Sequence, residues 1–244
     1  MSFVEIHPFN NAYPIPEGAR TLVVGTAPPP RFANPNCAGE GAHSLDFHFF
    51  YGSGKNRFWK FMNAIAKSFD EPLPGDEAPA AVYEAAARKF LSLHGIWFKD
   101  VLQTYERIPQ CSSFDKDILT PSNEQLTDLH RVLDQHRSIV RLAFTAELAA
   151  WWTFQSLDRL DLRDAYKRTL TDRKFSADSA VPFDAKAECA TFAKPFLDPI
   201  ITAELSGRKV EFFQLPSPSA AGFRPKGVTD ECLAKIYKQV LFPG

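Results

Sequence analysis

The string YGSGKNRFWK at residues 51–60 combines glycines, cations and an asparagine, which are residue types that could bind a phosphate or orient a water molecule. A Walker-type phosphate loop needs a glycine five positions before its Gly-Lys pair and a Ser or Thr directly after the lysine. This chain has Phe49 and Asn56 at those positions, so the string is not a nucleotide-binding loop of that type. The string must therefore be explained another way, and Asn56 is the remaining candidate for chemistry in it.

A second string, LPSPSAAGFRPKG at residues 215–227, places Ser217 and Ser219 next to prolines. Proline fixes its own φ and restricts the residue before it, so this turn is stiff. A stiff turn of small residues can bring hydroxyls and backbone N–H groups against a phosphate at low entropic cost. The string GTAPPPR at residues 25–31 has the same property. Either string could also be a rigid surface turn.

The elements that position these strings follow from the apolar pattern. Short runs rich in β-branched and aromatic residues predict four strands, at residues 21–26, 95–102, 138–145 and 209–215. Helical spacing predicts helices at about residues 78–92 and 122–136, around Trp151, from near Lys55, and from Thr229 as an N-cap. This alternation predicts an α/β fold, a three-layer αβα arrangement around a central four-stranded parallel sheet. Ligands bind such sheets beyond the carboxyl ends of the strands, where both proline-rich strings begin.

The polar segment at about residues 154–208 contains Pro182, Pro195 and Pro199 and fits neither pattern. We interpret it as a partly ordered excursion between a helix and the last strand. The chain has 244 residues, enough for one substantial core, so we expect a single domain over residues 1–244. We expect this domain to be a monomer.

Composition narrows the possible classes of protein. Hydrophobic residues make up 45% of the chain, which is ordinary for a soluble globular protein. The net charge of −1 does not by itself indicate a nucleic-acid-binding protein. The sequence has no apolar run long enough to cross a membrane and no secretory signal, so we expect a cytoplasmic protein, or a nuclear one in a eukaryote. The cysteines lack CxxC spacing, and we expect no metal site and reduced thiols at Cys37, Cys111, Cys189 and Cys232.

The chain resembles the uracil-DNA glycosylase superfamily in four successive strings: GTAPPP, FFYGSGKNRFWKFM, GIWFKDVLQTYERIPQCSSFDKDI and QLPSPSAA. The resemblance is greatest to the hypoxanthine-DNA glycosylase branch, with the mismatch-specific uracil glycosylases as neighbours. It covers roughly Thr21–Ala150 and Val210–Leu241. It implies a base excision repair enzyme that hydrolyses the N-glycosidic bond of a deaminated base, hypoxanthine or uracil, in DNA. The implied product is an abasic site, and no cofactor is implied.

Two positions depart from the pattern of the superfamily. Many members place Asn or Asp in the first loop to position the attacking water, where this chain has Ala27, whose methyl group cannot polarise water. Other branches place His or Asn at the start of the last motif, where this chain has Leu215. Members of the hypoxanthine branch also lack the first residue and resemble this chain in relying on the asparagine of the Asn-x-Phe-Trp string, here Asn56.

The resemblance assigns roles to residues of the two strings as hypotheses. An enzyme of this kind extrudes the damaged nucleotide from the duplex. The predicted base pocket comprises a stacking ring, space for the base edge and an oxyanion-type hole of backbone amides: Phe50 or Tyr51, Gly52, and Thr26, Ala27 and Pro28. The predicted DNA contacts are to phosphates or the vacated stack: Lys55, Arg57, Ser217, Ser219, Ala220, Ala221, Phe223, Arg224 and Lys226.

Each role has a simpler alternative. Asn56 could cap a helix, and Lys55 and Arg57 could be ordinary surface charges. Asp100, at the end of the second predicted strand, could be a general base or a hydrogen-bond acceptor within a loop. Two other functions stay open, a non-catalytic nucleic-acid-binding relative and a hydrolase or binder of small nucleosides. The glycosylase interpretation requires Asn56 and the turn around Ser217 to face each other across one crevice.

Overall fold

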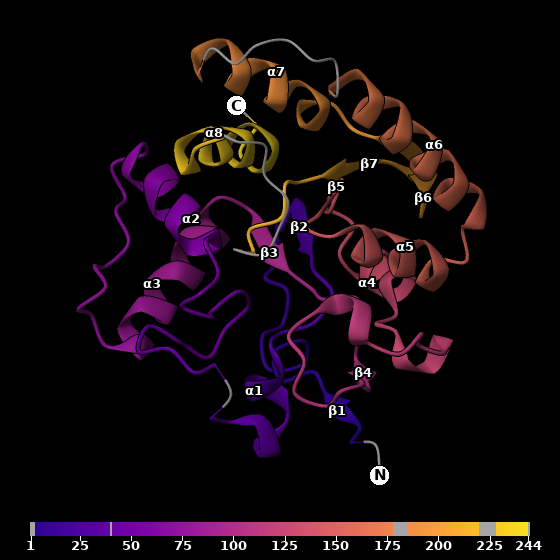
Figure 1. The fold of residues 1–244 in the computed structure, drawn as a ribbon. Helices are drawn as coiled ribbons and strands as arrows, with labels where there is room; N and C mark the ends of the chain where they lie inside the picture. The colour runs from indigo at the N-terminus through magenta and orange to yellow at the C-terminus, as the bar shows by residue number, and fades with distance from the viewer. Residues whose placement is uncertain (1–2, 40, 178–184, 220–227, 244) are drawn as a thin grey trace.

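The computed structural model describes residues 3–39, 41–177, 185–219 and 228–243. A five-stranded sheet with the strand order β3-β2-β5-β7-β6 lies at its centre (Figure 1). Four strands are mutually parallel and β6 (Ile201–Leu205) runs antiparallel to β7; the parallel strands are β2 (Thr21–Val24), β3 (Ile96–Phe98), β5 (Arg141–Phe144) and β7 (Arg208–Gln214). The predicted α/β fold is confirmed in outline, but the sheet has a fifth strand that the sequence analysis did not predict.

The parallel strands are buried because helices lie on both sides of them. Every residue of β2 and β3 is buried, as expected for strands covered on both faces. The register pairs Val23 of β2 with Phe98 of β3 and with Ala143 of β5. The carboxyl ends of β2, β3, β5 and β7 therefore meet at one edge, and the loops that follow them leave the sheet together.

Helices α2 (Phe58–Lys67), α3 (Ala80–Leu93) and α8 (Asp230–Leu241) gather on one side of the sheet, and α5 (Glu147–Ser156) lies on the other (Figure 1). The apolar face of α2 packs on α8, where the ring centroids of Phe58 and Phe61 lie 5.7 and 5.3 Å from that of Tyr237. Thr229 caps α8 as predicted, since its hydroxyl accepts a hydrogen bond from the N–H of Cys232. Helix α2 begins at Phe58 rather than near Lys55.

The helix predicted at residues 122–136 is wrong in its first half. The structure has a short 3-10 turn, η3 (Asn123–Gln125), and then α4 (Leu129–Gln135), which is capped by Asp128. Between them the backbone of Leu126 forms a bridge to Leu102, next to the end of β3. Pairing with this neighbouring chain segment satisfies backbone groups that a continuous helix would have used internally.

The segment at about residues 154–208 is more ordered than predicted. It contains α6 (Leu160–Ala177), α7 (Ala185–Leu197) and the edge strand β6. Its polar composition concealed a buried aromatic cluster, in which the Phe154 ring lies 5.4 Å from Tyr166 and 5.3 Å from Phe212 of β7. Burying these rings against the sheet gives the segment the apolar contacts that its average composition did not indicate.

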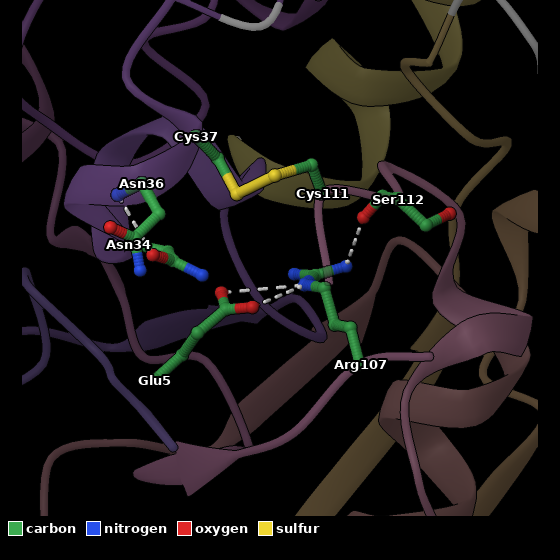
Figure 2. The surroundings of a disulfide bond; sticks show 7 residues. All are labelled: Glu5, Asn34, Asn36, Cys37, Arg107, Cys111 and Ser112. Atoms are coloured by element: carbon green, nitrogen blue, oxygen red, sulfur yellow. Dashed lines mark hydrogen bonds and ion pairs between the residues drawn. A yellow bond between two sulfur atoms is a disulfide. The ribbon is translucent and has the colours of Figure 1, made fainter. Parts of the chain in front are cut away.

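The prediction of reduced thiols is wrong for all four cysteines. Cys37 forms a disulfide with Cys111, and Cys189 forms one with Cys232. The partners are 74 and 43 residues apart in the sequence, so no local spacing could have revealed them. Figure 2 shows the first disulfide beside Glu5 and Arg107.

The remaining elements are short and lie near that disulfide. β1 (Glu5–Ile6) pairs antiparallel with β4 (Thr104–Tyr105). The chain after β2 forms α1 (Pro30–Ala33) and the 3-10 turn η1 (Pro35–Cys37), and the loop after β4 contains the 3-10 turn η2 (Asp115–Asp117). Over the described ranges, no helix is both long enough and apolar enough to span a membrane.

Candidate active site

A cavity of about 560 Å³ opens at the edge of the sheet where the parallel strands end. This volume lies in the range of about 300–1,000 Å³ that is usual for small-molecule sites. Loops from all four parallel strands line it, as does the string at 51–56. The residues that line the cavity include Phe9, Gly25, Thr26, Ala27, Pro28, Arg31, Phe50, Tyr51, Ser53, Lys55, Asn56, Asp100, Asp115, Thr145, Ser217 and Ser219.

The structure brings Asn56 and the turn around Ser217 to the same cavity. Asn56 and Ser219 form an antiparallel backbone bridge. The backbone N–H of Arg57 also donates a hydrogen bond of 3.0 Å to the carbonyl of Pro218. The two strings are therefore direct neighbours, and both line one crevice, which is the spatial condition that the glycosylase interpretation requires.

Asn56 also contacts the start of α2. Its side-chain oxygen accepts a hydrogen bond of 2.8 Å from the backbone N–H of Phe58. Asn56 is nevertheless not the N-cap of α2, because that position belongs to Arg57. The contact with Phe58 fixes the orientation of the amide, whose nitrogen donates to no residue in the described part of the chain. The amide can thus present its N–H groups to a ligand.

The predicted stacking rings are both in place but are largely committed to the protein. Phe50 is buried and stacks on Phe98 at a centroid distance of 5.5 Å. Tyr51 stacks on Phe58 at 4.6 Å, and its hydroxyl hydrogen-bonds to that of Thr145 at 2.8 Å. Burial raises the pKa of Tyr51 well above its usual value, so the hydroxyl stays protonated. Both rings line the cavity, but their stacking inside the protein limits the ring surface that remains available to a base.

Glycine is required at residue 52 for a reason other than the predicted one. A Cβ at this position would lie 2.1 Å from the carbonyl oxygen of Phe47 and 2.8 Å from that of Phe49. Gly52 is not among the residues that line the cavity, so it opens space for the backbone turn rather than for a base. At the cavity, the close approach occurs at Gly25, where a Cβ would lie 2.5 Å from a carboxylate oxygen of Asp100.

The loop after β2 offers two backbone donors to the cavity. Prolines lack an N–H, so only Thr26 and Ala27 can donate from the predicted Thr26–Pro28 hole. Neither N–H forms a hydrogen bond within the described ranges. Pro28 contributes shape, and its carbonyl is occupied by a 2.8 Å hydrogen bond from Arg107. The two free amides are available to an anionic or carbonyl oxygen in the cavity.

The predicted phosphate contacts divide into groups. Lys55 is exposed and lines the cavity, whereas Arg57 lies outside the lining and forms a 3.0 Å ion pair with Asp230 of α8. Ser217 and Ser219 are half-buried and line the cavity, and Ser217 accepts a hydrogen bond from the N–H of Ser219. The remaining predicted contacts, Ala220, Ala221, Phe223, Arg224 and Lys226, lie outside the described residues.

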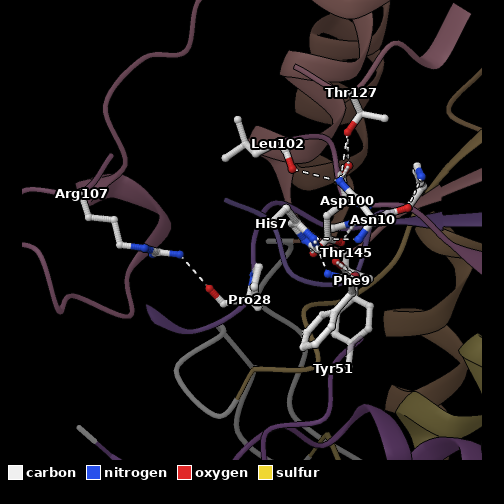
Figure 3. A network of polar contacts seen from close by, with 12 residues as sticks. His7, Phe9, Asn10, Pro28, Tyr51, Asp100, Leu102, Arg107, Thr127 and Thr145 are labelled. Atoms are coloured by element: carbon white, nitrogen blue, oxygen red, sulfur yellow. Dashed lines mark hydrogen bonds and ion pairs between the residues drawn. The ribbon is translucent and has the colours of Figure 1, made fainter. Parts of the chain in front are cut away.

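A buried acid at the floor of the cavity is held by several hydrogen bonds, and the sequence analysis left its role open. Asp100 follows β3 and is 6% exposed. One carboxylate oxygen accepts a hydrogen bond of 3.1 Å from the N–H of Gly25, and the other lies 2.9 Å from Nε2 of His7 (Figure 3). Both contacts fix the orientation of the carboxylate.

The hydrogen bonds of His7 define its tautomer. Its Nδ1 accepts hydrogen bonds from the backbone N–H groups of Phe9 and Asn10, at 3.2 and 3.1 Å. A nitrogen that accepts these bonds carries no proton, so the ring proton sits on Nε2 and is donated to Asp100. His7 therefore acts as a fixed donor that orients the carboxylate.

Asn10 fixes the backbone of Asp100 as well. Its side-chain oxygen accepts a hydrogen bond from the N–H of Asp100, and its nitrogen donates to the carbonyl oxygens of Asp100 and Leu102, all at 2.9–3.0 Å. The same nitrogen lies 3.1 Å from the hydroxyl oxygen of Thr127, whose hydroxyl group donates to the carbonyl of Asp100 (Figure 3). The sequence analysis missed His7 and Asn10 because they lie in the N-terminal string HPFNN, outside the strand and helix pattern.

A second carboxyl group, that of Asp115 in η2, lines the wall of the same cavity. Burial raises its pKa above the usual value and the negative charge of Asp100 adds to the rise, whereas the neighbouring Thr26 hydroxyl and Arg107 oppose it. That hydroxyl is buried and forms no well-aligned hydrogen bond with any described residue. Asp115 was not predicted as a site residue, because SSFDKD resembles an ordinary polar loop.

The segment at residues 43–54, part of which also lines the cavity, is held by one ion pair. Arg31 contacts both carboxylate oxygens of Asp46, at 2.7 and 2.9 Å, and donates to the hydroxyl of Ser53 at 2.7 Å. The N–H of Gly54 also donates to Asp46 at 2.8 Å. Asp46 is partly buried, yet these donors lower its pKa below the usual value. This contact links the loop after β2 to the segment that carries Asn56.

Among the described residues, no group of three or more His, Cys, Asp or Glu side chains could hold a metal ion. No protein-family model and no curated protein sequence matches the chain. Among solved structures, the chain is similar to the solution NMR structure of a putative uracil DNA glycosylase from Methanosarcina acetivorans. That match has 16% identity and a TM-score of 0.40, and it covers 64% of this chain and 78% of the other. A similarity of this size carries no argument about activity.

Proposed function

We propose that the chain is a monofunctional DNA glycosylase that hydrolyses the N-glycosidic bond of a deaminated base, hypoxanthine or uracil, in DNA. The observation that carries the proposal is the single cavity at the carboxyl ends of the parallel strands. It is lined by the oriented amide of Asn56 and the buried carboxylate of Asp100. The backbone N–H groups of Thr26 and Ala27 and the two serines Ser217 and Ser219 also line it. The product is an abasic site.

The cavity residues match the charges that develop when an N-glycosidic bond breaks. Positive charge grows on the sugar and negative charge on the departing base. The Asp100 carboxylate, oriented by His7 and Gly25, stabilises the positive charge. The N–H groups of Thr26 and Ala27 bind a carbonyl oxygen of the base, and Asn56 orients the attacking water. Stabilisation by fixed dipoles is strongest when water is excluded.

The presence of Asp100 compensates for Ala27. The methyl of Ala27 cannot polarise water, but the neighbouring strand β3 ends in a carboxylate that reaches the same cavity. The Asp100 side chain lies within hydrogen-bonding distance of the backbone N–H of Gly25, two residues before Ala27. An acid from the end of β3 thus lies beside the start of the loop in which many superfamily members carry theirs.

DNA is the proposed partner, with contacts at the mouth of the cavity. Ser217 and Ser219 bind phosphates that flank the extruded nucleotide, and Lys55 adds a positive charge beside them. We propose that Phe50 or Tyr51 contacts the extruded base through the ring surface that faces the cavity. We also propose that residues 1–244 act as one glycosylase-like domain and as a monomer, with α6, α7 and β6 as an addition at one side of the sheet.

An oligonucleotide assay tests the proposal. Purified protein is mixed with duplex and single-stranded DNA that contains hypoxanthine, uracil or xanthine, and alkali then cleaves any abasic site. We expect cleavage of a damaged strand and none of an undamaged strand. Asn56→Ala should lower the rate by about 10²-fold because the water loses its orientation. Asn36→Ala is the matched control, since Asn36 is exposed and outside the cavity.

The same assay separates the competing functions. Salt-sensitive DNA binding without cleavage of any of these bases would replace the proposal with a non-catalytic binder. Release of free base from nucleosides, without action on oligonucleotides, would replace it with a nucleoside hydrolase. An Asn56→Ala variant as active as the wild type would remove Asn56 from the mechanism.

A further inference from the structure

The cavity contains two carboxyl groups in opposite environments. Asp100 lies at the floor and accepts hydrogen bonds from His7 and Gly25. Asp115 is in the wall, is partly buried, and forms no ion pair with any residue that the structure describes. A site that supplies one base and one acid needs two such groups in different surroundings.

The loop that carries Asp115 is fastened to the loop after β2. Arg107 at the start of this segment donates to the carbonyl of Pro28 at 2.8 Å and to that of Ser112 at 3.1 Å. The disulfide from Cys111 to Cys37 ties the same segment to η1 (Figure 2). These links hold Asp115 against the stretch at 26–28 that offers its backbone amides to a base.

We propose that Asp115 is the general acid that protonates the departing base, and that Asp100 receives the proton of the attacking water. This inference rests on the proposed glycosylase function and deepens it. Asp115 takes the role that His or Asn could have at the position of Leu215 in other branches. A leucine side chain can neither donate a proton to a leaving base nor stabilise its charge. Leu215 is itself buried at the end of β7, so no polar side chain reaches the base from that position.

The step balances with these two side chains. The bond between the sugar C1′ and the base nitrogen breaks, and its electron pair leaves with the base. The Asp115 carboxyl proton moves to a nitrogen or carbonyl oxygen of the base, which departs neutral. The water oxygen forms the new bond to C1′, and the water gives one proton to the Asp100 carboxylate. Proton exchange with solvent then restores Asp115 to its acid form and Asp100 to its carboxylate form.

The electrostatic surroundings of Asp115 support its role as an acid. Burial and the charge of Asp100 raise its pKa, the Thr26 hydroxyl and Arg107 lower it, and the net shift is upward. The other titratable groups that line the cavity are Arg31, Tyr51 and Lys55. A raised pKa keeps the proton on Asp115 to a higher pH than an exposed aspartate would allow. Activity should therefore be present below this pKa and be lost as the pH rises through it.

The test is single-turnover cleavage of a uracil-containing duplex from about pH 5 to about pH 9, with wild type and Asp115→Asn. Loss of a general acid costs about 10²–10⁴-fold in rate, and the variant should also lose the decline at the alkaline side. A duplex with 5-fluorouracil, whose anion leaves more readily, should restore part of the rate in Asp115→Asn. Asp115→Glu keeps an acid and should keep the alkaline decline, at a shifted pH.

Asp117→Asn is the control, since Asp117 lies in the same turn but outside the cavity lining. The inference is overturned if Asp115→Asn has the wild-type pH profile, or if it loses the same factor on uracil as on 5-fluorouracil. A merely structural role would move both substrates equally. Wild-type protein that cleaves no deaminated base would instead overturn the proposed function, and the inference with it.

Discussion

The floor and the wall of the cavity both present an aspartate, but the chain surrounds the two side chains differently. Asp100 at the floor is fixed in its backbone by Asn10 and in its side chain by His7 and Gly25. Asp115 in the wall is carried by a loop that is fixed through its neighbours, and burial raises its pKa. The difference teaches that donors from distant segments hold one carboxyl group in a fixed orientation, whereas burial raises the pKa of the other.

Replacing the acid at the floor should have the largest effect. Asp100→Asn removes the charge that stabilises the sugar and accepts a proton, so the cleavage rate should fall about 10³–10⁴-fold, while the decline at the alkaline side remains. The new amide must also place its NH₂ opposite the N–H of Gly25 or of His7, which should cost about 1–3 kcal/mol of stability. Single-turnover rates and urea denaturation measure the two effects.

The comparison with the wall makes this result decisive. Asp115→Asn should lose the alkaline decline and show a loss that depends on the leaving group, whereas Asp100→Asn should keep the alkaline decline. If Asp100→Asn loses the alkaline decline and Asp115→Asn keeps it, the two roles are reversed. His7→Gln offers a milder test at the floor, because its amide can still donate to Asp100.

The loop that carries Asp115 is stabilised by a buried ion pair between Arg107 and Glu5. Arg107 Nε lies 3.2 Å from Glu5, and both side chains are 1% exposed. Arg107→Met should destabilise the protein by about 3–5 kcal/mol, because the carboxyl of Glu5 is left buried without its partner. Burial already raises the pKa of Glu5, and Arg107 opposes that rise. Urea denaturation measures the loss.

The double variant Glu5→Gln with Arg107→Met is the matched control. It removes the unpaired charge and should recover part of the stability. An equal loss in the single and double variants would mean that Arg107 acts through Pro28 and Ser112 rather than through Glu5.

Breaking the disulfide between Cys37 and Cys111 should loosen the wall and spare the floor. It closes a segment of 74 residues, and such a bond stabilises by about 2–4 kcal/mol. Cys111→Ser should lower the denaturation midpoint and speed hydrogen exchange around Ser112 and Asp115. The matched variant is Cys189→Ser, which breaks the bond to Cys232 in α8. It should lower stability without changing exchange in that wall.

If Cys111→Ser speeds hydrogen exchange at the amide of Asp100 as much as at that of Asp115, the floor and the wall are one cooperative unit. The proposed contrast between them would then be wrong.

The smallest effect should appear at the mouth of the cavity. Ser217→Ala with Ser219→Ala removes two hydroxyls that are proposed to bind phosphates, and DNA affinity should fall several-fold. Hydroxyls release few counterions, so the dependence of affinity on salt should hardly change. Lys55→Ala should instead make the affinity less dependent on salt, because a lysine that contacts a phosphate releases a counterion. Binding titrations at several salt concentrations separate the two, and an unchanged affinity in the serine variant would remove the phosphate role.

Much of the fold could be predicted because its signals are local. The apolar strands β2 and β5, the amphipathic helix α2 and the Thr229 cap can each be recognised from a few neighbouring residues. The prediction failed where distant contacts decide the outcome. Leu126 forms a bridge to Leu102 instead of continuing a helix. The ring of Phe154 in α5 packs between Phe212 of β7 and Tyr166 of α6.

The candidate site divides in the same way. The strings around Asn56 and Ser217 were recognisable because prolines, glycine and asparagine occur there in unusual combinations. Gly52 was given the wrong reason, since only the backbone of Phe47 shows why a side chain is excluded there. His7 was missed because its chemistry comes from Asp100, which is 93 residues away in the sequence.

The sequence by itself determined the alternation of strands and helices and the edge of the sheet where polar loops gather. Periodicity and residue type act over a few neighbours, so these features need no knowledge of the whole fold. The tertiary structure alone decided which cysteines pair, which donors hold Asp100 in place and how burial raises the pKa of Asp115. Those properties depend on the dielectric surroundings and on donors from distant segments, which exist only once the chain has folded.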